Sequence, residues 1–279
     1  MKKVKHTIEL LQGDCMKLMD DIPDKSIDLI LCDMPYGTTK LDFDEQPLPL
    51  DELWKHYNRI IKDNAAILLF SAQPFTTDLI CSNRKMFRYE IIWKKTLSTG
   101  FLNAKKMPMR AHENICVFYK HLPVYHPQMY VLSEDEIKQK GLQIGQKRVV
   151  EKGICKQYGK YKKDSYIEKG TRYPSDVIEF SNWNGVIFGN NENTTKHPTQ
   201  KPVSLLEYLI NTYSNEQDVV LDNCMGSGST GIACINTNRK FIGIEINGKY
   251  FDIAKQRIDK SYFGIKKQRI ENVYEKNRK

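Results

Sequence analysis

Residues 219–245 limit the folds open to this chain more than any other part of the sequence. An apolar run ends in Asp222 and enters a loop in which Gly226, Gly228 and Gly231 follow the spacing G-x-G-x-x-G. A helix-compatible stretch and a second apolar run come next, and that run ends in Glu245. A strand, a glycine loop, a helix and a strand tipped by an acid are typical of a nucleoside-binding unit in a parallel α/β sheet. A plain tight turn is the alternative interpretation of the glycines.

A second motif follows another apolar run, residues 27–32, which predicts a buried strand. Its end carries Asp33, Met34, Pro35 and Tyr36. Ligands bind beyond the carboxyl ends of parallel strands. At that edge the Asp33 carboxylate and the Met34 carbonyl can accept hydrogen bonds from one amino group, and the Tyr36 ring offers a flat face to a base. A strand end with a turn proline and a core tyrosine is the alternative.

The order of these motifs indicates a permuted sheet. After Glu245 the chain offers one more helix, residues 249–260, and a basic tail, so the third strand of the cofactor half must come from elsewhere. We assign it to residues 7–11, which Gly13 and Asp14 follow. The cofactor strands then come from both ends of the chain and the strand 27–32 lies beside them. Such an order is unusual for a dehydrogenase.

These residues resemble a known family, the amino-methylating DNA methyltransferases of the beta group, over most of the chain. Residues 33–36 resemble the family's Asp-Pro-Pro-Tyr, residues 222–228 its Asp-Pro-Phe-x-Gly-Ser-Gly loop, and residues 197–202 its His-Pro-x-x-Lys-Pro segment. The resemblance implies a Rossmann-like, doubly wound α/β methyltransferase sheet in circularly permuted order, with an inserted target-recognition lobe. It also implies methyl transfer from S-adenosyl-L-methionine to an amino group of a base flipped out of DNA.

The resemblance assigns roles to particular residues. Asp33, Met34, Pro35 and Tyr36 would form the catalytic clamp. Glu245 would take the ribose hydroxyls of the cofactor, and Asp14 would lie near its adenine. The loop around the methionine part would contain Asp222, Met225, Gly226 and Gly228, while Thr199 and Lys201 would lie near the cofactor carboxylate. No metal site is expected, because His197 has no second ligand nearby in the sequence.

Two departures from the family pattern bear on the chemistry. Met34 replaces the second residue of the tetrapeptide, a position that acts through its backbone carbonyl. Asn223 and Cys224 replace Pro-Phe in the loop and so remove an aromatic ring that packs on the cofactor in relatives. Relatives that methylate cytosine N4 usually begin the tetrapeptide with Ser, so Asp33 favours adenine N6, with cytosine N4 as the alternative.

Positive charge concentrates in two segments of this +9 chain. Residues 138–169 hold ten basic and three acidic residues among interleaved tyrosines, and residues 261–279 hold six basic and two acidic ones. Such clusters fit a phosphate backbone, although solvated surface is the alternative. We expect a catalytic half at 1–120, a target-recognition region at 121–196, a cofactor half at 197–260 and a basic tail at 261–279. Within the target-recognition region, Arg148 and Arg172 are candidate guanine contacts, and Asn182 or Asn184 is a candidate adenine contact.

Composition sets the remaining expectations. Seven cysteines without a metal-type pairing, no secretory signal and no apolar stretch long enough for a bilayer predict a cytoplasmic protein with free thiols and no membrane partner, associated with the nucleoid when bound to DNA. DNA is the expected partner. The resemblance also suggests a homodimer and is compatible with a companion restriction endonuclease.

Three other functions compete with this interpretation. A nicotinamide-dependent oxidoreductase would explain the glycine loop and Glu245 but gives no purpose to residues 33–36. A non-catalytic DNA-binding homologue is compatible with Asn223 and Cys224 but not with an intact tetrapeptide. An RNA substrate is the third alternative.

Overall fold

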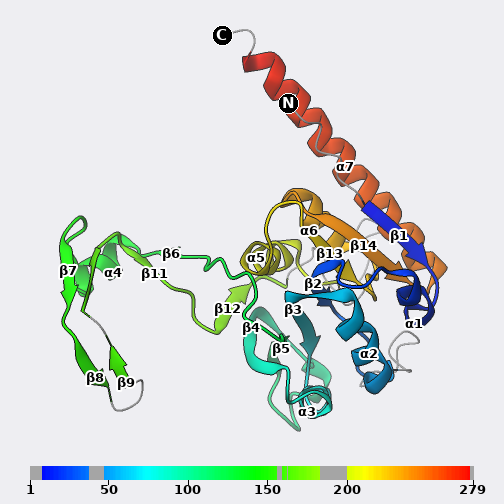
Figure 1. Ribbon diagram of the computed structural model, residues 1–279, viewed down its shortest axis with the longest axis horizontal. Helices are drawn as coiled ribbons and strands as arrows, with labels where there is room; N and C mark the ends of the chain where they lie inside the picture. Colours follow the sequence, from blue (N-terminus) through cyan, green and yellow to red (C-terminus); the bar gives the residue numbers. More distant parts are fainter. Residues whose placement is uncertain (1–7, 38–46, 156–158, 162, 183–199, 277–279) are drawn as a thin grey trace. The chain divides into compact units, whose positions relative to one another are not determined.

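The computed structural model describes residues 8–37, 47–155, 159–161, 163–182 and 200–276 (Figure 1). It divides into two compact units. The larger consists of Met1–His126 with Asp176–Lys279, and the smaller of Pro127–Ser175.

The larger unit is built on an eight-stranded mixed sheet. Five neighbouring strands, from β1 to β3 in spatial order, are mutually parallel, and β5 runs antiparallel to both of its neighbours. In spatial order the strands are β1 (Ile8–Gln12), β14 (Lys240–Glu245), β13 (Val219–Asp222), β2 (Ile27–Cys32), β3 (Ile61–Ser71), β5 (Arg110–Phe118), β4 (Phe87–Thr99) and β12 (Val177–Phe180). The two chain ends therefore supply adjacent strands, which confirms the doubly wound, permuted α/β sheet.

Helices cover both faces of this sheet. One face packs against α1 (Cys15–Leu18), the 3-10 turn η1 (Met19–Asp21), α2 (Leu50–Ile60) and α3 (Phe75–Ser82). The other packs against α5 (Val203–Tyr213), α6 (Ser229–Asn236) and α7 (Gly248–Lys276). Side chains of β2 alternate between the two cores, with Leu29 and Leu31 on the α5 side and Ile30 on the α2 side. An apolar run buried on both faces is what a central parallel strand requires.

The smaller unit consists of short strands and one helix. Two of its strands, β7 (Lys147–Val150) and β10 (Asp164–Ile167), pair antiparallel into a ribbon. Its other elements are β6 (Tyr130–Val131), α4 (Glu134–Gln139), β8 (Gly153–Cys155), β9 (Gly159–Tyr161) and β11 (Thr171–Arg172). All four residues of β10 are exposed, so this ribbon contributes little to a core.

Several element boundaries differ from those predicted. The helix expected at 249–260 continues to Lys276 as α7, because no proline or helix-ending glycine motif interrupts it, so the expected tail is helical over most of its length. The target-recognition region expected at 121–196 is wider than the compact unit Pro127–Ser175, since β12 joins the main sheet beside β4. In the part of the chain that the structure describes, no helix is long and apolar enough to cross a membrane.

Candidate active site

A cavity of about 1140 Å³ lies at the carboxyl edge of the parallel strands. Asp33 and Tyr36 line it from the end of β2, and Asp222 and Glu245 line it from the ends of β13 and β14. Asp14, which follows β1, lines the same cavity. The two sequence motifs and the N-terminal strand therefore contribute to one site, as expected for the working edge of an open α/β sheet.

The Asp33 carboxylate is held by two donors. The Tyr36 hydroxyl donates a hydrogen bond of 2.6 Å to its Oδ1, and the Lys201 Nζ lies 2.5 Å from its Oδ2. Lys201 precedes α5 and is 168 residues away in the chain. The Lys201 side chain is only 10% exposed, so the ion pair is largely shielded from water.

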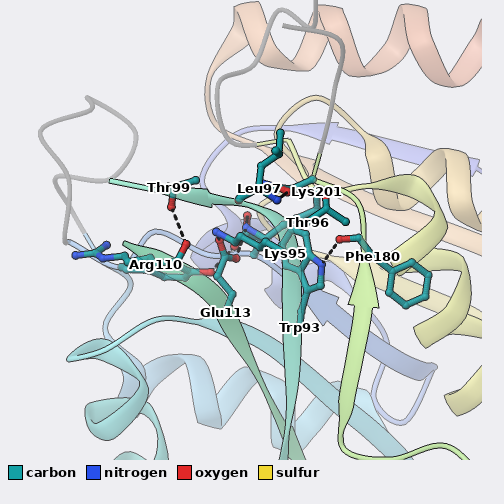
Figure 2. Close-up of polar contacts among 12 residues, drawn as sticks. Trp93, Lys95, Thr96, Leu97, Thr99, Arg110, Glu113, Phe180 and Lys201 are labelled. Carbon is teal, nitrogen blue, oxygen red and sulfur yellow. Dashed lines mark hydrogen bonds and ion pairs between the residues drawn. The ribbon is translucent and has the colours of Figure 1, made fainter. Parts of the chain in front are cut away.

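A second carboxylate continues this ion chain. Glu113 of β5 places Oε2 3.2 Å from the Lys201 Nζ, an ion pair without the geometry of a directed hydrogen bond. Its Oε1 lies 2.5 Å from the Nζ of Lys95, on neighbouring β4. Figure 2 shows Lys95, Glu113 and Lys201 converging from these strands and from the segment before α5. Two cations and two carboxylates alternate, so the chain Asp33, Lys201, Glu113, Lys95 balances its own charge.

Mutual pairing stabilises the charged forms of these buried groups. Burial alone would raise the pKa of Glu113, but the charges of Lys201 and Lys95 outweigh it and place that pKa below its ordinary value. Burial alone would lower the pKa of Lys201, but Asp33 and Glu113 raise it overall. Both groups are therefore ionised at neutral pH.

The Tyr36 ring stacks on Phe75 of α3, with ring centroids 5.2 Å apart and planes inclined by 19°. Burial, and then the nearby charge of Asp33, raise the pKa of the Tyr36 hydroxyl well above its ordinary value, so it remains a neutral donor. Its ring also lines the cavity. Tyr36 is thus fixed both by its hydroxyl and by its ring.

The glycine loop is fixed to the end of β14. The Gly226 N–H donates to the Glu245 Oε2 at 2.9 Å, and the Asn247 N–H donates to the Glu245 Oε1 at 2.8 Å. Gly228 has φ of 79°, a left-handed conformation that a side chain would strain, and an added Cβ there would lie 2.9 Å from Ala254 of α7. The loop therefore needs glycine both for its backbone turn and for its packing.

Asp222, at the end of β13, has neutral partners. Its Oδ2 accepts a 2.6 Å hydrogen bond from the Thr230 hydroxyl and its Oδ1 accepts one of 3.1 Å from the Cys224 N–H. Asp222 is 3% exposed, and burial raises its pKa to about 7 despite these bonds. Ser229, at the start of α6, also lines the cavity, and its buried hydroxyl has no hydrogen-bond partner among the described residues.

The departure at Asn223 has a structural partner. The Tyr57 hydroxyl, from α2, donates a 2.6 Å hydrogen bond to the Asn223 Oδ1, and both residues are buried. The Asn223 amide group also lies 3.7 Å from the sulfurs of Cys15 and Cys224. The polar side chain that replaces a proline is therefore satisfied within the fold.

The structure brings together most of the residues expected at the site. Met34, Pro35, Met225, Gly226 and Lys201 line the cavity, and Thr199 lies outside the described residues. Lys201, which was expected near the cofactor carboxylate, is paired with Asp33. Neither Glu113 nor Lys95 was predicted as a site residue, and a lone acid before the apolar run of β5 is the only local signal for Glu113.

Two expected base contacts are engaged in the fold. Arg172 donates from Nη1 to the Oε1 of Glu168 at 2.9 Å, and the Glu168 side chain is 2% exposed. The Asn182 amide accepts from the Leu97 N–H and donates to the Leu97 carbonyl, both at 2.9 Å. Asn182 thereby extends the pairing of β12 with β4, although it also lines the cavity. In the described part of the chain, no group of acidic, histidine and cysteine side chains could hold a metal ion.

Comparison with known proteins shows the family to which this chain belongs. A model of the N6/N4 family described as DNA methylase matches residues 27–256. The chain belongs to the DNA methylase family. The matched range includes the tetrapeptide at Asp33, the ion chain and the glycine loop.

Curated relatives of this DNA methylase agree with that assignment. It is 30% identical to the type II methyltransferase M1.MboII of Moraxella bovis, over 87% of this chain and 93% of the relative. It is 29% identical to the type II methyltransferase M.HpaI of Haemophilus parainfluenzae, over 90% of this chain and 74% of the relative. It is 28% identical to the DNA adenine methyltransferase YhdJ of Escherichia coli (strain K12), over 90% of this chain and 82% of the relative.

Solved structures share the fold of this DNA methylase. A complex of M1.HpyAVI with SAM matches with a TM-score of 0.56 and 24% identity, over 90% of this chain and all of the other. The PvuII DNA methyltransferase, named as cytosine-N4-specific, matches with a TM-score of 0.59 and 15% identity, over 92% of each chain. DNA methylases of this family use S-adenosyl-L-methionine as their methyl donor.

Proposed function

We propose that this chain transfers the methyl group of S-adenosyl-L-methionine to N6 of an adenine that is flipped out of DNA. The observation that carries the proposal is the placement of Asp33. Its charged carboxylate, fixed by Tyr36 and Lys201, lines the same cavity as the glycine loop and Glu245. A base acceptor and a nucleoside-binding edge thus share one site.

The base end of the site suits an amino group. The adenine must leave the duplex because its N6 is otherwise paired and stacked. An ionised carboxylate has about four acceptor positions, so Asp33 retains acceptor capacity beyond its bonds to Tyr36 and Lys201. Asp33 and the Met34 carbonyl would accept the two N6 hydrogens, and the Tyr36 ring would support the base. The negative charge of Asp33 also offsets the positive charge that develops on N6.

The cofactor end fits S-adenosyl-L-methionine. Glu245 would hold the ribose hydroxyls, since the bonds from Gly226 and Asn247 fix its carboxylate and leave further acceptor positions. The unpartnered Ser229 hydroxyl supplies a buried polar group facing the same cavity, and Asp14 would lie near the adenine. When bound, the cofactor supplies a methyl group that a nucleophile can take by direct displacement. The protein residues contribute mainly by positioning.

Asp33 supports adenine rather than cytosine as the target. The first residue of the tetrapeptide is usually Ser in relatives that act on cytosine N4, and it is Asp here. The fold does not distinguish the two bases, because a structural neighbour named as cytosine-N4-specific has the same architecture. YhdJ, a relative named as an adenine methyltransferase, supports adenine.

We assign target recognition to the smaller unit and its flanks, within residues 121–196. The exposed Tyr166 and the basic residues of its ribbon support this role. We further propose a cytoplasmic homodimer that acts beside a companion restriction endonuclease; the names of three relatives, type II methyltransferases, support only the endonuclease part. A monomeric mass in sedimentation at working concentration would contradict the homodimer.

Methyl transfer to DNA tests the proposed function directly. Genomic DNA lacking adenine and cytosine methylation is incubated with the protein and labelled S-adenosyl-L-methionine, and the product nucleosides are separated. We expect labelled N6-methyl-2′-deoxyadenosine, and we expect Asp33→Ala to lose activity by about 10³-fold or more because the charged acceptor is gone. Asp78→Asn, at an exposed acid of α3, is the matched control and should retain activity.

Each other outcome has a defined meaning. Labelled N4-methylcytosine would show that the target is cytosine and not adenine. Label in competing RNA alone would show that the substrate is RNA and not DNA. No transfer by the wild type to varied genomic DNA would contradict catalysis altogether. Sequencing that detects modified bases, applied to DNA from expressing cells, then identifies the recognition sequence.

A further inference from the structure

The hairpin that joins β4 to β5 exposes an unusual number of large apolar side chains. We name residues 97–110 the hairpin tip. Leu102 is 95% exposed and Phe101 is 77% exposed. The other exposed apolar side chains of the hairpin tip are Leu97, Met107 and Met109. Apolar side chains gathered on one exposed surface feature mark an interaction site.

The charge of the hairpin tip specifies the kind of partner. Between Lys94 and Arg110 the sequence has five basic residues and no acid. Lys94 and Lys95 are paired with Glu179 and Glu113. The three other basic side chains have no ion-pair partner in the described ranges; they are Lys105, Lys106 and Arg110. Exposed apolar side chains beside cations without ion-pair partners suit a partner that carries many negative charges outside and apolar groups inside.

The hairpin tip has a defined backbone conformation. Gly100 has φ of 92° and precedes the 3-10 turn η2 (Phe101–Asn103). The Asn103 N–H donates to the Gly100 carbonyl at 2.9 Å, and the Lys106 N–H donates to the Asn103 carbonyl at 2.8 Å. The apolar side chains are therefore presented on a turn that is hydrogen bonded to itself.

The base of the hairpin tip adjoins the active site. Thr99 pairs with Arg110 across the two strands, and both line the cavity. Figure 2 shows this pair on the same two strands that carry Lys95 and Glu113. A base that enters the cavity beside Asp33 therefore comes from a duplex lying close to this hairpin.

We propose that the hairpin tip is the wedge that enters the duplex and occupies the space beside the flipped-out adenine. This inference rests on the proposed function, since it requires a base to leave double-stranded DNA. Phe101 and Leu102 take over stacking contacts that the departing base gives up, and Lys105, Lys106 and Arg110 contact the adjacent phosphates. Apolar side chains inserted between base steps are an established way to unstack and kink a duplex.

The wedge has its largest effect where opening the base pair is costly. A paired adenine loses stacking and pairing when it flips, and these losses are smallest for a mismatched or unpaired base. Removal of the wedge should therefore slow methylation of a fully paired site and have little effect on a site that is already open. A residue that only maintains the fold would affect both substrates equally.

The test compares two duplexes that carry the protein's own recognition sequence. One has thymine opposite the target adenine, and the other has an abasic site there. For the double variant Phe101→Ala with Leu102→Ser, we expect kcat/KM to fall about tenfold or more on the paired duplex and to stay within about threefold of wild type on the abasic duplex. The matched control is Thr77→Ala with Asp78→Ser, at two adjacent exposed residues of α3 that do not line the cavity; it should resemble wild type on both.

The outcomes separate the wedge from the proposed function. An equal fall on both duplexes, or no fall on the paired one, would overturn the wedge while leaving methyl transfer intact. Absence of transfer by the wild type to either duplex would refute the proposed function and the wedge together.

The lysines of the hairpin tip provide an independent measurement. Lys105→Gln with Lys106→Gln should weaken binding to both duplexes and reduce the salt slope of log K by about 1.8, since each neutralised phosphate contributes about 0.9. The apolar double variant should leave that slope unchanged. A slope unaffected by the lysine variant would overturn the assigned phosphate contacts.

Discussion

Two aspartates end neighbouring strands of the sheet, and the protein surrounds their carboxylates in opposite ways. Asp33, after β2, is paired with the Lys201 ammonium at 2.5 Å and belongs to a chain of alternating charges. Asp222, at the end of β13, accepts bonds only from neutral groups among the partners described, the Thr230 hydroxyl and the Cys224 N–H. Burial raises the pKa of Asp222 to about 7.

This difference in surroundings suits Asp33 to a chemical role and Asp222 to a structural one. A carboxylate that accepts hydrogen bonds from a base and offsets a developing positive charge acts through its negative charge, and Lys201 holds the Asp33 carboxylate in place. Asp222 fixes the start of the glycine loop with its two bonds, a role that a carboxyl group partly protonated at neutral pH can fulfil. Residue type alone does not distinguish these roles, whereas the surrounding charges do.

The largest expected effect is the loss of unfolding free energy that ionisation of the buried Asp222 causes as the pH rises to neutral. Its folded-state pKa of about 7 lies above the ordinary 3.8, so folding disfavours its ionisation. The stabilising contribution is fully present below about pH 4 and is lost as the pH rises to about 7. Relative to Asp222→Asn, the wild type should therefore lose up to about 4 kcal/mol of unfolding free energy across that interval. Urea titrations of both proteins at several pH values measure the difference.

The pH dependence of that difference, rather than its size at one pH, is the relevant result. The amide of Asp222→Asn presents an NH₂ group to donors that now face a carboxylate oxygen, which adds a constant offset. A difference between the two proteins that stays constant from pH 4 to pH 8 would show that Asp222 is ionised throughout. The contrast with Asp33 would then fail.

The same contrast shows what local sequence can and cannot predict. The strand ends, the glycine loop and the permuted strand order follow from apolar runs and glycine spacing, which are local patterns. The ion chain could not be predicted, because Lys201 meets Asp33 across 168 residues. Likewise, Asn223 is a departure from the family pattern whose partner, Tyr57, lies 166 residues away. Such pairs are fixed by the assembled fold.

The next largest effect concerns the far end of the ion chain. Glu113→Gln removes one of the two carboxylates around Lys201, so Lys201 loses the partner that draws it away from Asp33 and the geometry of Asp33 shifts. We expect kcat to fall about 30-fold, equivalent to about 2 kcal/mol, with affinity for S-adenosyl-L-methionine unchanged. Glu113→Asp should restore part of the loss. Single-turnover rates and equilibrium cofactor binding separate the two quantities.

Glu179→Gln is the matched control for that variant. Glu179 also pairs with a lysine of β4, Lys94, at 2.8 Å, but both side chains are more than half exposed. An exposed pair contributes little, so this variant should behave as wild type. Equal losses in Glu113→Gln and Glu179→Gln, or a loss of cofactor affinity in Glu113→Gln alone, would contradict a positioning role for Glu113.

The smallest expected effect is that of removing the Tyr36 hydroxyl alone. Tyr36→Phe removes the 2.6 Å bond to Asp33 but retains the ring that stacks on Phe75. Because Lys201 still holds the other carboxylate oxygen, kcat should fall only about threefold to tenfold, whereas Tyr36→Ala also removes the support for the base and should lose about 100-fold. Methylation rates of the two variants on one duplex measure this. Equal losses would assign the whole role of Tyr36 to its hydroxyl, and Asp33 would then depend on that bond more than on its cation.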